Sequence, residues 1–346
     1  MPAVTVVLVF LTLAAQADPS KAMPRWEPQT SGTTARFRGV CAVNDQVAWA
    51  SGTEGTFSRT TDGGQSWRPG RVAGASGLDF RDVEAFDDGR AVLLASGPGE
   101  KSRVYRTTDG GETWSLRFTN PDPDGFLDAI AFWGPDHGLA FGDPVGGRFR
   151  VFLTDDGGSS WHPAGPEGIP PARNGEGAFA ASGTCMVALR GTRKAWFATG
   201  GVGGSRVFRT DDGGRTWAAS QAPIRSGTAS AGVFSLDFAN AKHGVAIGGD
   251  YKLPDEASPN LARTDDGGIT WSLVKNGPVG YRSAVAYVSA TSLVAVGPTG
   301  SDLTAADGSL GKVLSKTGYH AVSLAPSKLR GWAVGDDGRV ARLVAR

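Results

Sequence analysis

The sequence Thr-Thr-Asp-Gly-Gly-Gln-Ser-Trp at residues 60–67 has four close copies further along the chain. They share a threonine, an aspartate two residues later, two glycines and a final tryptophan, and they lie at residues 107–114, 154–161, 210–217 and 264–271. Successive tryptophans are 47, 47, 56 and 54 residues apart. Repetition at such a period is typical of proteins built from one supersecondary unit per repeat.

Each copy has the composition of a tight turn between two strands. The aspartate accepts hydrogen bonds from nearby backbone N–H groups, and the glycine pair supplies the positive φ angles of a hairpin. The tryptophan opens the returning strand and buries its ring between sheets. We therefore predict structural roles for the five aspartates and five tryptophans: Asp62, Asp109, Asp156, Asp212 and Asp266, with Trp67, Trp114, Trp161, Trp217 and Trp271.

Two further phrases recur between these copies. A short apolar strand that ends in glycine occurs seven times, from residues 47–52 to residues 331–335. A second phrase, which we interpret as the innermost strand, begins regularly at Phe37, Phe80, Phe126, Val233, Tyr281 and Tyr319, and its irregular fourth copy falls within residues 175–182. Each unit thus holds about four short strands, which is the content of a propeller blade.

The number of blades follows from the length of the chain. Dividing the 329 residues from 18 to 346 by seven gives 47, which equals the first two tryptophan spacings. We therefore predict an all-β, seven-bladed propeller of four-stranded antiparallel blades. The last unit lacks a fourth strand, and the segment around Trp26 resembles one, so we expect it to pair with residues 339–344 and close the ring. The sixth unit, at residues 304–311, has lost both the aspartate and the tryptophan.

The N-terminal residues resemble an export signal. An apolar run from Val4 to Ala15 ends in Ala-Gln-Ala, which matches a signal peptidase site. We predict a signal peptide at residues 1–17, a propeller at residues 18–346, a periplasmic or secreted protein, and no integral membrane segment after cleavage. No lysine or arginine precedes the run, so an uncleaved N-terminal anchor remains an alternative.

We interpret Cys41 and Cys185 as buried apolar residues rather than a disulfide.

The charge of the chain and its motifs narrow the possible partners. The formal net charge is +1 and only 20% of residues are charged, without the basic stripe of a nucleic-acid-binding protein. No metal-ligand spacing, P-loop, nucleophile elbow or dinucleotide fingerprint occurs in a suitable context. We therefore expect no nucleic acid, metal or cofactor, and a monomer.

A set of basic residues stands at the start of the innermost strands. Arg38, Arg81, Arg282 and His320 share one position of the repeat, and Arg36 lies beside them. Repeat symmetry would place them around one mouth of the channel, where arginine forks suit carboxylates and polar peptide segments. The alternative is that they neutralise nearby aspartates.

Acidic residues suggest a different function. Asp82 and Asp128 share a position in adjacent units and Glu176 is nearby, so they are candidates for the two carboxylates of a glycoside hydrolase. The structural alternative, which we favour, is that they are polar groups near a wet channel that bond to backbone. The Phe/Tyr-Arg-Ile-Pro motif of sialidases is absent.

The five copies resemble bacterial-neuraminidase (BNR) or Asp-box repeats. Together with the strand at residues 331–335, they look like the photosystem II stability/assembly factor family, over the chain from Trp26 to Arg346. The resemblance implies an exported propeller that acts as an assembly chaperone without known catalysis and binds its client partly through arginines on one face. Our hypothesis is a protein-binding assembly or scaffolding factor, and the alternative is a glycan-binding protein or sialidase-like glycoside hydrolase.

Overall fold

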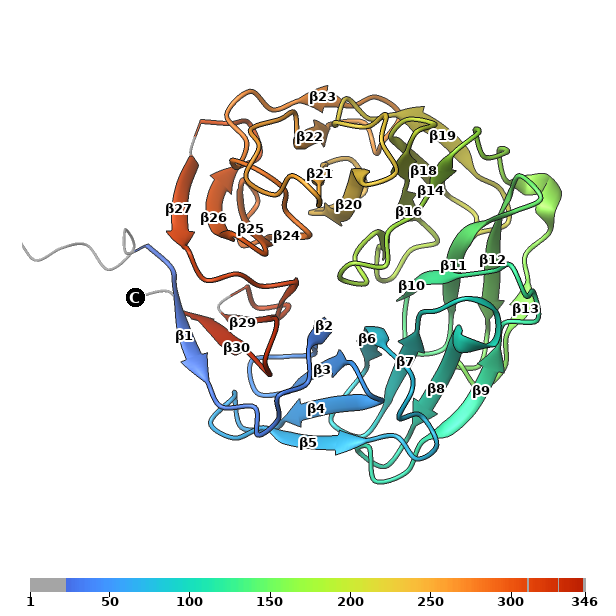
Figure 1. Ribbon diagram of the computed structural model, residues 1–346, viewed down its shortest axis with the longest axis vertical. Helices are drawn as coiled ribbons and strands as arrows, with labels where there is room; N and C mark the ends of the chain where they lie inside the picture. The colour runs from blue at the N-terminus through green and yellow to red at the C-terminus, as the bar shows by residue number, and fades with distance from the viewer. Residues whose placement is uncertain (1–22, 310, 329, 345–346) are drawn as a thin grey trace, which may run out of the picture.

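Seven antiparallel blades surround a central axis in the computed structural model, which describes residues 23–309, 311–328 and 330–344 (Figure 1). The prediction of an all-β, seven-bladed propeller is confirmed. The predicted signal peptide, residues 1–17, lies outside the described residues. No helix in the described ranges is long and apolar enough to cross a membrane.

The first three blades follow the chain in simple order, from the innermost strand outward. Blade 1 contains β2 (Phe37–Ala42), β3 (Ala48–Gly52), β4 (Thr56–Thr60) and β5 (Arg68–Arg71). Blade 2 contains β6 (Phe80–Ala85), β7 (Ala91–Ala95), β8 (Arg103–Thr107) and β9 (Ser115–Thr119), with the short 3-10 helix η2 (Gly99–Lys101) between β7 and β8. Blade 3 contains β10 (Leu127–Phe132), β11 (Gly138–Val145), β12 (Arg148–Thr154) and β13 (His162–Pro163).

The remaining blades include the long insertions and the closing strand. Blade 4 contains β15 (Met186–Ala188), β16 (Ala195–Ala198), β18 (Arg206–Thr210) and β19 (Ala218–Gln221). Blade 5 contains β20 (Ala231–Phe238), β21 (Gly244–Asp250), β22 (Leu261–Thr264) and β23 (Ser272–Leu273). Blade 6 contains β24 (Ala284–Tyr287), β25 (Ser292–Gly297), β26 (Gly300–Ala305) and β27 (Gly311–Ser315). Blade 7 contains β28 (Ala321–Leu324), β29 (Arg330–Val334), β30 (Val340–Val344) and β1 (Arg25–Gln29).

The N-terminal strand closes the ring as the sequence predicts. β1 pairs antiparallel with β30, and Trp26 lies opposite Leu343. The Trp26 indole donates a hydrogen bond to Ser301 in blade 6, 2.9 Å away, and its ring lies 5.4 Å from that of Tyr319. One strand therefore completes blade 7 and also joins it to blade 6.

The innermost strand of blade 4 is not where the sequence suggests. It is β15 at Met186–Ala188, whereas residues 175–182 contain β14 (Glu176–Gly177), which pairs with β17 (Gly200–Gly201) at the edge of blade 5. The short 3-10 helix η3 (Pro166–Gly168) precedes this region. Residues 175–184, here called the crossing segment, reach toward the axis as the green loop ahead of β16 in Figure 1.

The Asp-box corners form a repeated hydrogen-bond pattern. In blade 1, Thr60 Oγ1 donates to Asp62 Oδ1 at 2.8 Å and accepts from the Gly64 N–H at 2.8 Å. The Ser66 hydroxyl donates to Asp62 Oδ2 at 2.6 Å, and this bond and the Ser66 N–H lower the pKa of Asp62 to about 2. These contacts hold the turn that carries Trp67.

The indoles that follow the corners pack between blades. Trp114 of blade 2, for example, meets Phe57 and Trp49 of blade 1, with ring centroids 5.1 and 6.1 Å away. Both cysteines, Cys41 and Cys185, are buried and free.

Candidate functional site

A cavity of about 520 Å³ lies at one end of the central channel. It is lined by residues at the start of the innermost strands and by the crossing segment. Five of the eight candidate site residues reach it, namely Arg36, Arg38, Arg81, Asp128 and His320. We call it the arginine cavity.

β-bulges explain which side chains face the arginine cavity. In blade 1, Phe37 pairs with Gly52 and Gly39 pairs with Ser51, so Arg38 has no cross-strand partner. The same irregularity skips Arg81 in blade 2 and Asp128 in blade 3. A bulge re-aims the extra residue, and here it directs the skipped side chain toward the channel.

Asp128 therefore corresponds to Arg81 in the structure, and not to Asp82 as the sequence phrase suggests. In β6 the residue after the bulge is Asp82, whereas in β10 it is Ala129. Aligning the two strands on their leading aromatic residues shifts blade 3 by one position.

Arg282 also lies one position away from the place in the repeat that the sequence predicts, and it does not line the arginine cavity. Its N–H donates to Gly248 of the preceding blade, as the N–H of the buried Phe37 donates to Gly335. The Arg282 side chain is 6% exposed, and its Nε donates to Asp302 Oδ2 at 2.6 Å. This arginine belongs to a buried ion pair inside blade 6.

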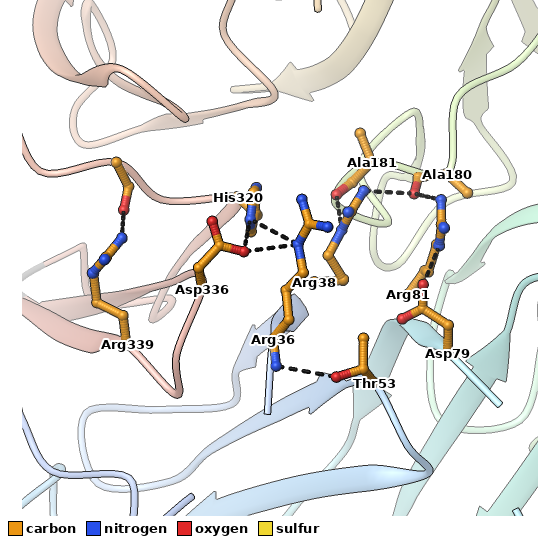
Figure 2. A network of polar contacts seen from close by, with 11 residues as sticks. Arg36, Arg38, Thr53, Asp79, Arg81, Ala180, Ala181, His320, Asp336 and Arg339 are labelled. Atoms are coloured by element: carbon orange, nitrogen blue, oxygen red, sulfur yellow. Dashed lines mark hydrogen bonds and ion pairs between the residues drawn. The ribbon is translucent and has the colours of Figure 1, made fainter. Parts of the chain in front are cut away.

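The guanidinium groups of the arginine cavity hold the crossing segment (Figure 2). Arg38 Nε donates to the Ala181 carbonyl at 3.2 Å, and its Nη2 donates to the Ala180 carbonyl at 3.4 Å. Arg81 Nη1 donates to the same Ala180 carbonyl at 3.1 Å, and Arg81 Nε donates to Asp79 at 2.8 Å. Backbone carbonyls thus occupy one side of both guanidinium groups.

The charges in this cluster are unevenly balanced. Arg81 is paired with Asp79, and Arg36 lies 2.7 Å from Asp336 Oδ1. Arg38 makes no ion pair with any described residue. Burial, followed by the charges of Arg81 and Arg36, lowers the pKa of Arg38 to about 10, so it remains a cation at neutral pH. The cavity therefore contains one guanidinium that is in ion-pair contact with no described carboxylate.

His320 completes the basic side of the cavity. Its Nε2 lies 2.9 Å from Asp336 Oδ1. Burial and the nearby charge of Arg38 lower its pKa, although Asp336 opposes the change. His320 is therefore mostly neutral at pH 7, which leaves the positive charge to the arginines.

Aromatic rings form another side of the same cavity. Phe179 of the crossing segment stacks on Phe234 with centroids 3.9 Å apart, and Tyr281 meets Phe234 edge-on at 4.7 Å. Tyr251, 48% exposed, lies 6.2 Å from Phe234 at the opening. Sequence reasoning missed this aromatic side because Phe179 and Tyr251 lie outside the regular repeat.

A buried carboxyl group lies below the crossing segment. Burial, and then the negative charge of Asp143, raise the pKa of Asp128 well above its usual value. Asp143 Oδ1 accepts a hydrogen bond from the Ala178 N–H at 2.8 Å. Asp128 Oδ2 is buried and has no hydrogen-bond partner among the described residues.

The three acids proposed for a glycosidase do not share a site. Asp82 Oδ2 accepts the Ile130 N–H at 2.8 Å, and Asp82 lines a different cavity of the channel from Asp128. The Glu176 side chain is fully buried, and its Oε1 accepts from Arg206 Nε at 2.8 Å. Both acids therefore serve structural contacts. No group of three or more potential metal-binding side chains occurs in the described part of the chain.

Comparison with known proteins supports the repeat assignment. The family model described as BNR/Asp-box repeat matches residues 105–116 and 262–273. The chain is a propeller with BNR/Asp-box repeats. A search of curated proteins found no match.

Several solved structures share the fold of this Asp-box propeller. YCF48 bound to D1 peptide has a TM-score of 0.62 and 18% identity, covering 96% of this chain and 99% of that one. YCF48 from Cyanidioschyzon merolae has a TM-score of 0.63 and 16% identity, covering 92% and 99%. The Neurospora crassa Pan2 WD40 domain has a TM-score of 0.64 and 14% identity, covering 90% and 89%. At these identities the likeness concerns the fold.

Proposed function

We propose that this protein is an exported, non-enzymatic propeller that binds a segment of a partner protein in the arginine cavity and serves as an assembly or scaffolding factor. The observation that carries the proposal is the guanidinium of Arg38, which is charged, partly buried and without a carboxylate partner among the described residues. A carboxylate from a partner would form the charge-assisted hydrogen bonds that this arginine lacks.

The neighbouring aromatic side supports a peptide ligand. Phe234 and Tyr281 offer an apolar surface beside the arginines, and Tyr251 stands exposed at the opening. A cavity with rings on one side and arginines on another suits a chain segment that presents an apolar and an acidic group together. Its volume of about 520 Å³ holds a few side chains.

The way in which the crossing segment is bound gives further support. Its carbonyls accept hydrogen bonds from Arg38 and Arg81, and its Ala178 N–H is bound by Asp143. The cavity thus already binds peptide backbone. Among proteins of this fold, YCF48, a photosystem II assembly factor, is known in a complex with the D1 peptide, so a peptide-binding role has a precedent.

Export is part of the proposal and rests on the N-terminal sequence. The apolar run and the Ala-Gln-Ala site at residues 15–17 support transfer out of the cytoplasm and cleavage after Ala17. N-terminal sequencing of the mature protein tests this. A protein in the envelope fraction whose sequence still begins at residue 1 would favour the uncleaved anchor.

The partner is identified by affinity purification from the native envelope fraction followed by mass spectrometry. The test variant combines Arg38→Ala with Arg81→Ala, and the matched control combines Arg68→Ala with Arg117→Ala on exposed outer strands. We expect one recurring protein that the control retains and the test variant loses. Equal recovery by both variants would rule out the arginine cavity.

A further inference from the structure

The cavity between blades 5 and 6 lies on the opposite face of the propeller from the arginine cavity. Its volume is about 700 Å³, and it is lined by the end of β20, the loop that follows, and the degraded corner of blade 6. An equivalent cavity between blades 3 and 4 measures only about 210 Å³. We call the two the 5/6 groove and the 3/4 groove.

The backbone contacts show that the two grooves correspond. In blade 3 the N–H of Trp133 donates to the carbonyl of His137 at 3.0 Å, and in blade 5 the N–H of Ala239 donates to His243 at 3.0 Å. At the rim, His137 lies 2.9 Å from Asp155, and His243 lies 3.1 Å from Asp265. Ala239 therefore occupies the position of Trp133.

Two indoles lie at the 3/4 groove: Trp133 lines it, and Trp217 packs at the same corner. A Cβ atom placed on Gly214 would lie 3.8 Å from Trp217 and 3.9 Å from Trp133, so both rings meet at this corner. The Trp133 indole also donates to the Lys194 carbonyl at 2.7 Å, which joins blade 3 to blade 4. Only a small space remains.

The 5/6 groove lacks both indoles. Ala239 stands in place of Trp133, and Gly311 stands in place of Trp217. A Cβ atom on Gly308, the counterpart of Gly214, would meet Val274 and Asn276 and no aromatic ring. The other six outer corners each carry a tryptophan: Trp26, Trp67, Trp114, Trp161, Trp217 and Trp271.

One ring of the 5/6 groove has lost the indole against which its counterparts pack. At the end of the innermost strand, Phe132 meets Trp161 edge-on at 6.0 Å, and Phe238 meets Trp271 edge-on at 6.1 Å. Tyr287 is the corresponding ring in blade 6 and lines the groove. It has no aromatic neighbour among the described residues, because Gly311 provides no side chain.

We propose that the 5/6 groove binds an aromatic side chain, above all an indole, that a partner protein inserts between the two blades. The groove is a second binding site, independent of the arginine cavity. Its volume lies within the range of ligand sites, roughly 300–1,000 Å³, and its position is filled by indoles elsewhere in this chain. Burying an aromatic ring between blades is favourable for the same reason that Trp133 and Trp217 are buried.

Ligand-observed fluorine NMR with 5-fluorotryptophan tests the groove without interference from the ten native tryptophans. The probe is placed in a blocked Gly-Trp-Gly peptide, and blocked triglycine is the negative control. We expect saturable binding by the wild-type protein. Ala239→Trp fills the groove from within, so its affinity for the probe should be lower by about tenfold or more. Arg38→Ala should bind the probe as the wild type does, so this result is separate from the fate of the arginine cavity.

Two further variants allow the groove to be tested even if Ala239→Trp does not fold. If Ala239→Trp does not fold, Gly311→Trp replaces it, since a Cβ at this position meets only the Asn276 carbonyl oxygen at 3.4 Å. Trp133→Ala should open the 3/4 groove and create additional binding. Absence of binding by the wild type, or undiminished binding by the filled variants, would overturn the proposal. Binding of free 5-fluoroindole but not of the peptide would contradict a protein partner.

Discussion

The two ends of the central channel are built from the same innermost strands but carry different polar groups. At one end Arg36, Arg38 and Arg81 surround a cavity of about 520 Å³. At the other end Asp82 and Glu84 line a cavity of about 210 Å³, here called the carboxylate cavity. The crossing segment lies between them and contributes residues to both.

The polar groups at the two ends of the channel have different roles. In the carboxylate cavity, Asp82 accepts the Ile130 N–H of the next blade at 2.8 Å, and Asp237 accepts the Tyr287 N–H of the next blade at 2.7 Å. These carboxyl groups join neighbouring innermost strands. At the arginine end, the guanidinium groups bind the crossing segment and face the cavity. One end therefore stabilises the ring, and the other is suited to recognition.

The largest expected change in the free energy of unfolding distinguishes Arg282 from Arg38, two arginines in similar sequence contexts. Arg282→Ala leaves Asp302 buried without its partner, and such a loss costs about 3–5 kcal/mol. Arg38→Ala removes a partly exposed side chain that makes hydrogen bonds only to carbonyls, and we expect a loss of about 1 kcal/mol. Urea unfolding measures both free energies. Equal losses would mean that Arg38 belongs to the structural framework as Arg282 does.

A smaller effect is expected in the carboxylate cavity. Asp82→Ala leaves the buried N–H groups of Ile130 and Val83 without acceptors, which should cost about 1–3 kcal/mol in the free energy of unfolding. Glu112→Ala, on an exposed corner, serves as the control. Partner binding at the arginine cavity should be unchanged in the folded fraction. Loss of binding without loss of stability would assign Asp82 to recognition instead.

A further effect concerns pH. Burial raises the pKa of Glu84 from 4.5 to about 7, and the charge of Arg190 only partly opposes it. Between these values the folded protein keeps a proton that the unfolded chain releases, so stability should fall as pH rises from 4.5 to about 7. The urea midpoint should decline over this range, and Glu84→Gln should reduce the slope. A midpoint that rises with pH would contradict this assignment.

The fold was predictable because its signal is local and repeated. Each Asp-box corner combines a turn and a buried indole within eight residues, so five copies define the blades without knowledge of distant contacts. The pairing of β1 with β30 also followed, since the last unit lacked one strand and Trp26 matched it.

Register at the channel mouth was harder to predict. The aromatic residue at the start of the phrase does not keep one position in the blade: Leu127, and not Phe126, occupies the position of Phe80, so aligning the two phenylalanines matched Asp82 with Asp128, whereas Asp128 corresponds to Arg81. Arg282 shifted for the same kind of reason, because Arg282, and not Tyr281, occupies the position of Phe37. A shift by one residue moves a side chain from the channel into the blade.

The crossing segment escaped prediction for a different reason. It interrupts the repeat of blade 4, so periodicity carries no information about residues 175–184. Its aromatic Phe179 and the half-buried Asp143 reach the arginine cavity only through contacts between distant parts of the chain.

The central claim is that the arginine cavity binds a partner segment, and the most direct measurement is the dissociation constant of the purified protein for that segment. Isothermal titration would compare the wild type, Arg38→Ala/Arg81→Ala and Arg68→Ala/Arg117→Ala. We predict about a hundredfold weaker binding for the first variant, corresponding to about 2.7 kcal/mol, and wild-type affinity for the second. Equal affinity in all three proteins would contradict the account.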